Sequence, residues 1–478
     1  MSSPLLSYVS CGVGKSFGFV HPSLLIAPAK NAGRGVLASL SIPKGTVLIK
    51  LNRHQATSES VERRRDPPPS SASASASSSD PDPSPPPARS DWLLTITALL
   101  RLLLLPATPY TRSLPANAAA FNTLLSWSES ERAGLESTSL RQVLPEATCE
   151  AVIERFESRV RPALPEEIRG KVTKEQFLCA ALAVSTRGFH TPSADDPSKM
   201  EGPFLLPLID MLNHDPMNPG GVLSRDDNGD FLVTAVRDIR EGEELTHSYG
   251  PFDNAALLRT YGFIVAKPPM CSPVLLGAGE VVRACRAVAD RFRSVEHDTS
   301  SGDESWDPGS GWDKKEVWLR SRLEAGGGGL EVTFEAGLTD ATVTCFAGMM
   351  LESSAFSDLF GNNNEADNSD DLEKEQVAAE KFLGKLAFLA AKETFAARLA
   401  GYPNPLSTDE ATVKKKGRGE GGYRGYCAAT VRLEEMRVLH KLTAEVQKVL
   451  AGLGVKDDTM NEEAGGGGEA KTKKIKLF

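Results

Sequence analysis

The sequence lacks several features that would assign it to a protein class at once. It has seven cysteines, but none lie close together, and the nearest pair is Cys271 and Cys285. This spacing excludes CxxC zinc motifs and argues against a disulfide framework. The HExxH motif of zinc hydrolases is also absent. We therefore expect no metal centre, and we expect free thiols in a reducing compartment.

The sequence also lacks a long apolar run and an excess of positive charge. Its most apolar stretch, 93–105, includes Arg101 and is shorter than the roughly 20 residues that a bilayer requires. No basic segment followed by an apolar core opens the chain, so we expect no signal peptide. The net charge of -9 disfavours nucleic-acid binding, which needs concentrated Lys and Arg. We expect a monomer in the cytoplasm, the nucleus or both, without membrane or nucleic-acid partners.

What is present fits a soluble globular protein with several domains. The 478 residues are 40% hydrophobic and 24% charged, which is ordinary for such proteins and suggests about two to four domains. Residues 66–90 are almost entirely Pro, Ser, Ala and Asp. Because such a stretch cannot bury apolar surface, we expect a disordered insertion there.

Apolar periodicity predicts a β-rich part that encloses a helical insert, followed by a helical part. Strands are predicted at 26–28, 36–38, 47–51, 204–209, 221–224, 231–235 and 244–246. Helices are predicted at 92–105, 118–126, 149–159, 174–186, 254–261, 281–292, 314–324, 372–400 and 430–451. Asp227-Asn228-Gly229 signals a hairpin turn, and Ser128 with Glu131 signals a helix capping box.

Two segments place polar residues beside strands. Residues 32–36 read Ala-Gly-Arg-Gly-Val, and glycines on both sides of an arginine let the backbone approach a ligand closely. A plain tight turn explains the same letters. In the second segment, 204–214, an apolar stretch leads into Asp210, Asn213 and His214. Polar side chains at the end of a buried strand often face a ligand, although an Asx turn with a core histidine fits equally well.

A third segment, 239–263, carries two Tyr-Gly pairs. They begin at Tyr249 and Tyr261 and lie on either side of a short helix, which Asp253 or Asn254 would cap. Taken alone, the two tyrosines also fit a pair of core aromatic residues.

In this order the three segments resemble the SET-domain methyltransferases. The most similar group includes the Rubisco large-subunit lysine methyltransferase, the fungal ribosomal-protein lysine methyltransferases and related animal enzymes. In that group a helical insert splits the SET fold, and a helical substrate-binding domain follows. Residues 184–189 are similar to the group's Ser-Arg-x-Phe segment, but Thr186 stands before the arginine. His247 before Ser248 is a second departure.

The resemblance implies an α+β protein with a β-rich SET fold, a helical insert and an all-α substrate-binding domain. The SET domain would span 20–268, with the insert at about 92–200. The substrate-binding domain would span 269–455, and a flexible tail would occupy 456–478.

The resemblance also implies S-adenosylmethionine (AdoMet) as the methyl donor. The first segment would contact its methionine part, and the second would hold its adenine and amino-acid ends. The implied cofactor-binding residues are Ala32, Gly33, Arg34, Arg187, Asp210, Asn213 and His214. Tyr249 would be the catalytic tyrosine, and Tyr261 and Phe263 would bind the substrate side chain.

The implied activity is protein-lysine N-methylation of a non-histone protein, with a ribosomal or translation protein as the expected substrate. Two alternatives stay open: methylation of a histidine by the same fold, and a non-catalytic SET module that only binds. Asn213, His214 and Tyr249 speak against the non-catalytic module. In the aromatic channel that the resemblance implies, burial would disfavour the charged form of a lysine and so free its lone pair.

Overall fold

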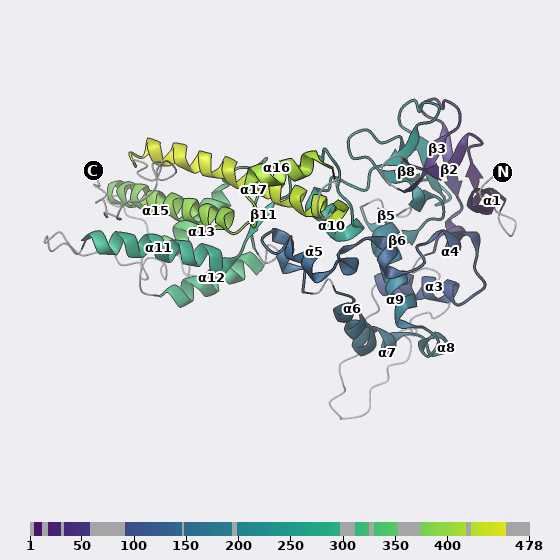
Figure 1. Ribbon diagram of the computed structural model, residues 1–478, viewed down its shortest axis with the longest axis horizontal. Helices are drawn as coiled ribbons and strands as arrows, with labels where there is room; N and C mark the ends of the chain where they lie inside the picture. Colours follow the sequence, from purple (N-terminus) through teal and green to yellow (C-terminus); the bar gives the residue numbers. More distant parts are fainter. Residues whose placement is uncertain are drawn as a thin grey trace, which may run out of the picture. The chain divides into compact units, whose positions relative to one another are not determined.

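The computed structural model describes residues 4–11, 18–29, 33–57, 91–145, 148–193, 198–296, 311–324, 329–351, 373–416 and 422–455. The chain divides into two compact units (Figure 1). The first unit comprises Met1–Arg132 and Gln142–Pro269, and the second comprises Ala133–Arg141 and Met270–Phe478. The first unit combines short strands with many helices, and the second unit is mainly helical, which is the predicted α+β class. The insertion predicted at 66–90 lies outside the described residues.

The first unit contains three small sheets. Their strand orders are β1-β4-β9-β8, β2-β3-β10-β7 and β5-β6. The strands are β1 (Phe19–Val20), β2 (Leu24–Pro28), β3 (Arg34–Ala38), β4 (Val47–Leu51), β5 (Gly188–Pro192), β6 (Met200–Leu205), β7 (Asn213–His214), β8 (Gly221–Arg225), β9 (Phe231–Ala235) and β10 (Glu244–His247). The predictions for 47–51 and 231–235 are confirmed to the residue. The predicted hairpin joins β8 to β9, and Gly229 has the positive φ of 76° that its turn requires.

The second sheet brings distant parts of the sequence together. Strand β10 pairs antiparallel with β3, where Leu245 lies opposite Val36. On its other side β10 pairs parallel with β7, where Thr246 lies opposite Asn213. This register places the Gly-Arg-Gly segment, the Asn-His segment and the approach to Tyr249 on three neighbouring strands.

Helices surround the sheets of the first unit. The longest are α3 (Asp91–Leu103) and α9 (Lys174–Arg187), which pack against each other (Figure 1). A capping box of Thr173 and Gln176 starts α9. The remaining helical segments up to Tyr261 are α1 (Pro4–Cys11), η1 (Arg53–Gln55), α4 (Pro109–Ser113), η2 (Ala118–Phe121), η3 (Leu124–Ser126), α5 (Glu129–Ala133), η4 (Ser139–Gln142), α6 (Cys149–Arg155), η5 (Phe156–Val160), α7 (Arg161–Ala163), α8 (Glu166–Arg169), η6 (Ile209–Met211) and α10 (Asn254–Tyr261).

Two helix predictions in this region need correction. Residues 118–126 form two 3-10 turns instead of one helix, because Asn122 takes a left-handed conformation (φ 53°) that ends η2. The helix predicted at 149–159 stops at Arg155 and continues as one π-helical turn, η5. The helix at 254–261 and the capping box of Ser128 and Glu131 are confirmed.

The second unit is a bundle of helices with one short hairpin. Figure 1 shows its helices running alongside one another, and α15 packs against α11, α13 and α17. The elements are β11 (Val274–Leu276), α11 (Ala278–Glu296), α12 (Trp312–Glu324), β12 (Leu330–Val332), α13 (Asp340–Met350), α15 (Glu373–Ala400), α16 (Leu406–Lys414) and α17 (Gly422–Gly452). Four of these helices were predicted, whereas α13, α16 and the β11–β12 hairpin were not.

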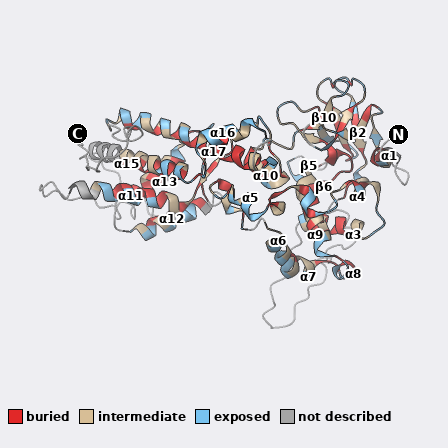
Figure 2. Cartoon of the chain, in the orientation of Figure 1, coloured by how far each residue is buried: buried red, intermediate tan, exposed pale blue. Residues whose placement is uncertain are grey.

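Each unit has its own apolar core. The core of the first unit is built around Leu48, Ile49 and Leu99, all with no exposed side chain. The core of the second centres on α11, α15 and α17 and includes Leu386, Phe395 and Leu439. Residues Cys427–Met436 of α17 are buried on every side. Along α11, Figure 2 shows buried residues on one side and exposed residues on the other. An apolar stripe of this kind is what drives helices to pack.

A segment from the middle of the chain, 133–141, belongs to the second unit. The Ser139 backbone N–H donates to the Glu435 carboxylate at 2.8 Å, and the Leu275 N–H donates to the Ser139 hydroxyl at 2.7 Å. Arg432 donates to the Gly134 carbonyl at 2.6 Å. The second unit is therefore completed by residues that precede it by well over a hundred positions.

Candidate active site

A cavity of about 210 Å³ in the first unit collects most of the predicted site residues. Four of its lining residues are aromatic, and five are polar or charged. The lining residues are Arg34, Pro115, Ala120, Phe121, Thr186, Arg187, Asp210, Met211, Asn213, Tyr249, Tyr261 and Phe263. We call it the aromatic cavity. Among the predicted residues, Gly33 and His214 are direct neighbours of lining residues, and Ala32 lies outside the described residues.

The Gly-Arg-Gly turn forms as the sequence predicted. Gly33 has a φ of 69°, and its carbonyl accepts the Ala29 N–H at 2.7 Å, which closes the turn between β2 and β3. Only glycine adopts this conformation without strain. Arg34 follows directly, and its guanidinium donates to the Ser113 carbonyl at 2.9 Å. This contact ties the turn to α4 of the helical insert.

The approach to Asp210 differs from the strand predicted at 204–209. Strand β6 ends at Leu205, and Leu208 turns the chain with a φ of 72° and a ψ of -41°. A leucine rarely takes this conformation, and such strain is often found at functional sites. The short turn η6 then delivers Asp210 to the cavity wall.

Tyr249 lies at the centre of the aromatic cavity. Its hydroxyl donates to the Leu212 carbonyl at 2.9 Å, and its backbone N–H donates to Nδ1 of His214 at 3.0 Å. The ring is surrounded by His214, His247 and Tyr261, each with a centroid distance of 4.9 Å. Burial raises the pKa of the Tyr249 hydroxyl well above its ordinary value. The tyrosine is therefore neutral, and its orientation is fixed by hydrogen bonds and ring contacts.

Two neutral histidines, His214 and His247, pack against the ring of Tyr249. Nδ1 of His214 accepts a hydrogen bond, so the ring must carry its proton on Nε2 in the neutral form. Burial lowers the pKa of His214, and burial together with the nearby His214 lowers the pKa of His247 to about 4. The Nε2 atoms of both rings are buried and have no partner. Sequence analysis assigned no role to His247, because its position between Phe189 and Tyr249 follows only from the fold.

A buried polar group joins the helical insert to the cavity. Nη1 of Arg187 donates to the Asp210 carbonyl at 3.0 Å and lies 3.6 Å from its carboxylate. The Tyr110 hydroxyl, from α4, donates to the same carboxylate at 3.1 Å. Burial raises the pKa of Asp210, and the positive charge of Arg187 opposes that rise. Sequence reasoning missed Tyr110, because a lone tyrosine in a short helix carries no signal.

A hydrogen bond between two loops positions Tyr261 and Phe263 in the cavity wall. Helix α10 ends at Gly262, whose φ of 79° permits the chain to reverse between Tyr261 and Phe263. Nδ2 of Asn122 donates to the Gly262 carbonyl at 3.0 Å. A Cβ at position 262 would clash with the Asn122 carbonyl. The two aromatic residues are thus set by a glycine that sequence analysis recognised only as part of a Tyr-Gly pair.

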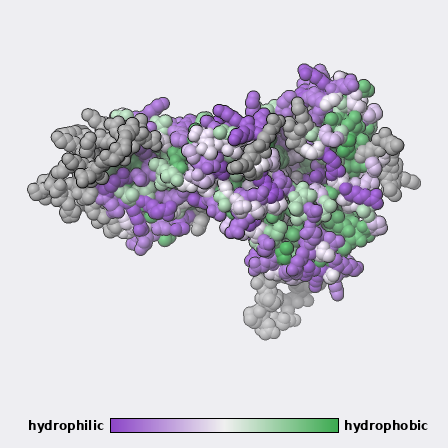
Figure 3. Space-filling model, in the orientation of Figure 1, coloured by the Kyte–Doolittle hydropathy of each residue, from purple (hydrophilic) through white to green (hydrophobic). Residues whose placement is uncertain are grey.

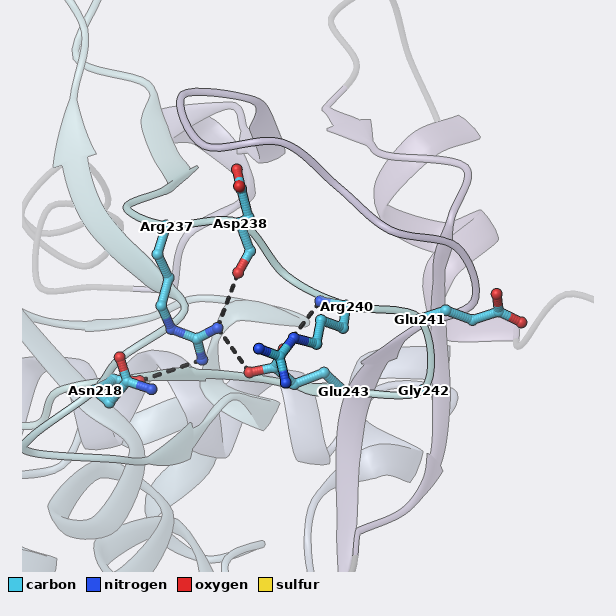
Figure 4. A pocket seen from close by; sticks show the side chains of 7 residues that line it. All are labelled: Asn218, Arg237, Asp238, Arg240, Glu241, Gly242 and Glu243. Atoms are coloured by element: carbon cyan, nitrogen blue, oxygen red, sulfur yellow. Dashed lines mark hydrogen bonds and ion pairs between the residues drawn. The ribbon is translucent and has the colours of Figure 1, made fainter.

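A larger, open hollow of about 480 Å³ lies elsewhere on the first unit (Figure 4). Its charged groups already pair with one another. Arg237 contacts the Glu243 carboxylate at 2.6 Å and donates to the carbonyls of Asp238 and Asn218. Glu243 also accepts the Arg240 backbone N–H at 2.9 Å. With no aromatic wall and its main charge compensated, this hollow is the weaker candidate for a ligand site.

Neither a metal site nor a membrane span is found in the described ranges. No group of three or more His, Cys, Asp or Glu side chains in the described part of the chain could hold a metal ion. Among the helices that the structure describes, none combines the length and the apolarity needed to span a membrane.

Comparison with known proteins matches this site to a family. Residues 33–250 match the family described as "SET domain". This segment of the chain is therefore similar to a SET domain. The match runs from the Gly-Arg-Gly turn to the Tyr-Gly pair at 249, and so it includes every strand that contributes to the aromatic cavity.

Three curated relatives are similar to parts of this chain. The mouse (Mus musculus) "SET domain-containing protein 4" is 29% identical over 25% of this chain and 28% of its own length. Two Schizosaccharomyces pombe proteins also match: "Ribosomal lysine N-methyltransferase set11" at 25% identity over 53% of this chain, and "Ribosomal lysine N-methyltransferase 4" at 39% over 15%. These matches span 60% and 15% of the two yeast proteins, so the chain covers less than two thirds of each relative.

Solved structures share the whole fold. "Structure of Rubisco LSMT bound to AdoMet" superposes with a TM-score of 0.60 at 16% identity, covering 90% of this chain and 88% of that one. "Crystal structure of the SET domain of LSMT bound to Lysine and AdoHcy" gives 0.56 at 15% identity and covers 93% of both chains. At this identity the likeness concerns the fold. It extends over both units of the chain.

Proposed function

We propose that this protein is a protein-lysine N-methyltransferase that uses AdoMet and acts on a non-histone protein, with a ribosomal protein as the substrate class. The observation that carries the proposal is the environment of Tyr249. A neutral hydroxyl, hydrogen-bonded to the Leu212 carbonyl, stands among aromatic rings inside the SET domain. The names of the yeast relatives support lysine as the acceptor and the ribosome as the source of the substrate.

The residues present fit AdoMet. Aromatic faces and oxygen acceptors favour a positively charged ligand, and the cavity offers Tyr249, Tyr261, Phe263 and Phe121 for this purpose. Buried polar atoms without partners, His214 Nε2 and Asp210 Oδ1, are available to a ligand. Arg34, Asn213, His214 and Arg187 would hold the cofactor. When bound, AdoMet supplies a methyl group on a positively charged sulfur, which becomes neutral once the methyl group has moved to the acceptor nitrogen.

The chain's own residues prepare the acceptor. A lysine in water has a pKa near 10.4 and is mostly protonated. Between Tyr249, Tyr261 and Phe263 the charged form loses its hydration, which lowers the pKa of the incoming amine and releases its lone pair. No cysteine lines the cavity, and the two histidines beside Tyr249 are neutral. The site is therefore suited to a transfer that needs alignment, and it offers no activated protein nucleophile.

Tyr249 aligns the amine and needs no change in its own protonation. Its hydroxyl proton is committed to the Leu212 carbonyl, so the hydroxyl oxygen is left as an acceptor for the polar hydrogens of a bound amine. Alignment of this kind can contribute about 7–11 kcal/mol to lowering a barrier. The carbonyl and the hydroxyl are fixed by the backbone of η6 and by the surrounding rings.

The test uses the full-length protein, labelled AdoMet and purified ribosomal subunits. We expect label on one or a few ribosomal proteins, and none when Tyr249→Phe replaces the parent. Acid hydrolysis of the labelled product should release methylated lysine. Methylated histidine would redirect the proposal to the alternative acceptor, and absence of transfer to any protein fraction would leave only a binding role.

The place of action follows as a smaller proposal. A ribosomal-protein substrate is made in the cytoplasm and assembled in the nucleus, and we propose one or both as the site of action. We propose that the chain acts as a monomer, because the aromatic cavity is built from residues of a single first unit. Sedimentation of the purified protein at working concentration tests the second point.

A further inference from the structure

Glu244 lies directly behind the cavity residue Asn213. Its Oε1 accepts a hydrogen bond from Nδ2 of Asn213 at 2.5 Å, and the same nitrogen donates to the Arg34 carbonyl at 3.2 Å. The three residues come from β10, β7 and β3, which are neighbours in the second sheet. This small network therefore ties together the three strands that floor one end of the aromatic cavity.

The network fixes which atom Asn213 offers to a ligand. A carboxylate and a backbone carbonyl are both acceptors, so only the amide nitrogen of Asn213 can face them. Both of its protein contacts are made through that nitrogen. Its Oδ1 is then the atom left for a ligand, and this end of the cavity recognises a hydrogen-bond donor or a cation.

Gly35 makes room for the carboxylate. A Cβ at this position would lie 2.5 Å from Oε1 of Glu244 and 3.0 Å from Nδ2 of Asn213. Real Cβ atoms essentially never show contacts below 3.0 Å, so any larger residue would push the Glu244 carboxylate away from Asn213. The second glycine of the Gly-Arg-Gly segment thus has a defined task, which is to admit a negative charge beside the cavity.

The other charged groups around the cavity leave this charge effective. The Arg187 guanidinium is paired with Asp210, and the Arg34 guanidinium is directed to the Ser113 carbonyl. Burial is the main cause of the raised pKa of the Tyr249 hydroxyl, Arg187 opposes the rise, and the charge of Glu244 adds a smaller contribution in the same direction as burial. A negative charge that reaches the central tyrosine will also act on a cation bound beside it.

We propose that Glu244 is a specificity-determining residue, which makes the aromatic cavity favour a positively charged ligand over a neutral ligand of the same shape. The inference rests on the proposed function. There the cation is the sulfonium of AdoMet, and the neutral counterpart is S-adenosylhomocysteine (AdoHcy), the product left after methyl transfer. Glu244 therefore weakens product binding relative to substrate binding and limits inhibition by the product.

The experiment measures the dissociation constants of AdoMet and AdoHcy by calorimetry on the full-length parent and on Glu244→Gln. Glutamine retains an oxygen that can accept from Asn213 but removes the charge. We expect the ratio of the two constants to shift toward AdoHcy by about tenfold, which is the size expected for one charge acting across a cavity. The ratio is taken within each variant, so partial unfolding reduces the stoichiometry and leaves the ratio unchanged.

Glu243→Gln is the matched control. It removes the same charge one residue earlier, from a carboxylate that is held in the open hollow of Figure 4 by Arg237. Its ratio should equal that of the parent. Glu244→Asp keeps the charge on a shorter side chain, so both ligands should weaken while the preference for AdoMet remains. This variant also answers the question if the glutamine variant does not fold.

Each outcome decides a different point. A ratio for Glu244→Gln within twofold of the parent, or an equal shift in Glu243→Gln, overturns the inference and leaves Glu244 a structural residue. A parent protein that binds neither ligand overturns the proposed function itself. Loss of preference in Glu244→Asp would show that geometry, and not charge, sets the discrimination.

Discussion

The two units of this protein treat buried polar groups in opposite ways. In the first unit, Asp210 Oδ1 and the Nε2 atoms of His214 and His247 are buried without a partner. In the second unit, Glu435 accepts from the Tyr402 hydroxyl at 2.6 Å and from the Ser139 N–H at 2.8 Å. Native proteins rarely leave buried polar atoms unpaired. The contrast indicates that the unpaired atoms of Asp210 and His214, which lie at or beside the aromatic cavity, are available to a ligand.

The second unit uses its charges for cohesion. Arg432 binds Asp409 through two hydrogen bonds of 2.8 and 2.6 Å, and both side chains are almost fully buried. Glu434 accepts both the backbone N–H and the hydroxyl of Ser272. Here only the Nε of Arg398 and the Ser137 hydroxyl are unpaired among the described buried side chains. We therefore assign chemistry to the first unit and a structural role to the ion pairs of the second.

The largest expected effect concerns Tyr249. Tyr249→Phe removes one hydroxyl whose partner is the Leu212 carbonyl. We expect methyl transfer to fall by about a hundredfold or more, because a preorganised group at the reacting centre is lost. The melting temperature should change little, since the aromatic ring and its contacts remain. Turnover within twofold of the parent would contradict the role assigned to this tyrosine.

The second prediction concerns a substitution that should lower stability and leave cofactor binding intact. Arg432→Ala leaves the buried Asp409 carboxylate without its charged partner, and only the Asn404 amide still donates to it. Breaking a buried ion pair in this way costs about 3–5 kcal/mol. We expect the second unit to unfold at a lower denaturant concentration, while cofactor affinity in the first unit is unchanged. Denaturation followed by circular dichroism and calorimetry with AdoHcy measure the two quantities.

The control for this prediction is the double variant Arg432→Met with Asp409→Leu. Replacing a buried ion pair by apolar residues of similar size is often nearly neutral. The double variant should therefore recover most of the lost stability. If both variants are equally unstable, the ion pair is not the cause.

The sequence predicts the local backbone structure of this protein better than it predicts which side chains meet. The strands 47–51 and 231–235 and the helix 254–261 were predicted to the residue, because alternation, a hairpin turn and a cap at Asp253 are all local signals. The segment 118–126 was predicted wrongly as one helix. Its break at Asn122 depends on a contact with Gly262, which is 140 positions away.

The same limit applies to the site. The resemblance supplied Arg34, Arg187, Asp210, Asn213, Tyr249, Tyr261 and Phe263, and the fold gathers these seven around one cavity. It did not supply Tyr110, Phe121 or Glu244. Tyr110 and Phe121 enter from the insert, and Glu244 acts only because β10 lies between β3 and β7. No local pattern encodes such neighbours, so only tertiary structure shows them.

The third prediction uses pH to separate the units. Burial lowers the pKa of His247 to about 4, below its ordinary value of 6.5. Between these values the unfolded chain binds more protons than the folded chain, so the first unit loses stability as pH falls from 6.5 to 4. The loss should reach about 3 kcal/mol, at 1.36 kcal/mol per pH unit. His247→Phe should reduce this dependence, and His214, whose pKa is also lowered by burial, should account for part of what remains.

In the second unit the sign is opposite. Burial raises the pKa of Glu435 from 4.5 to about 7. Between these values the folded chain binds more protons than the unfolded chain, so this carboxyl contributes stability that is full below 4.5 and is lost as pH rises toward 7. Glu435→Gln should flatten the response. Unfolding curves between pH 4 and 7 that move in the same direction for both units would break the comparison.

The smallest expected effects come from a matched pair of helix caps, one in each unit. The Thr173 hydroxyl accepts the Gln176 N–H at 3.1 Å at the start of α9, and the Thr339 hydroxyl accepts the Thr342 N–H at 3.2 Å at the start of α13. Loss of such a cap typically costs about 1 kcal/mol. Because the two units have separate cores, we expect Thr173→Ala to destabilise only the first unit and Thr339→Ala only the second.

AdoHcy identifies the transitions in this experiment. A ligand that binds the folded first unit raises its midpoint according to ligand concentration, so the transition that moves with added AdoHcy belongs to that unit. Thr173→Ala should lower this transition alone and leave turnover unchanged, because the cap lies at the end of α9 opposite to Arg187. If either substitution lowers both transitions equally, the units unfold together, and the division of labour between them would concern chemistry but not stability.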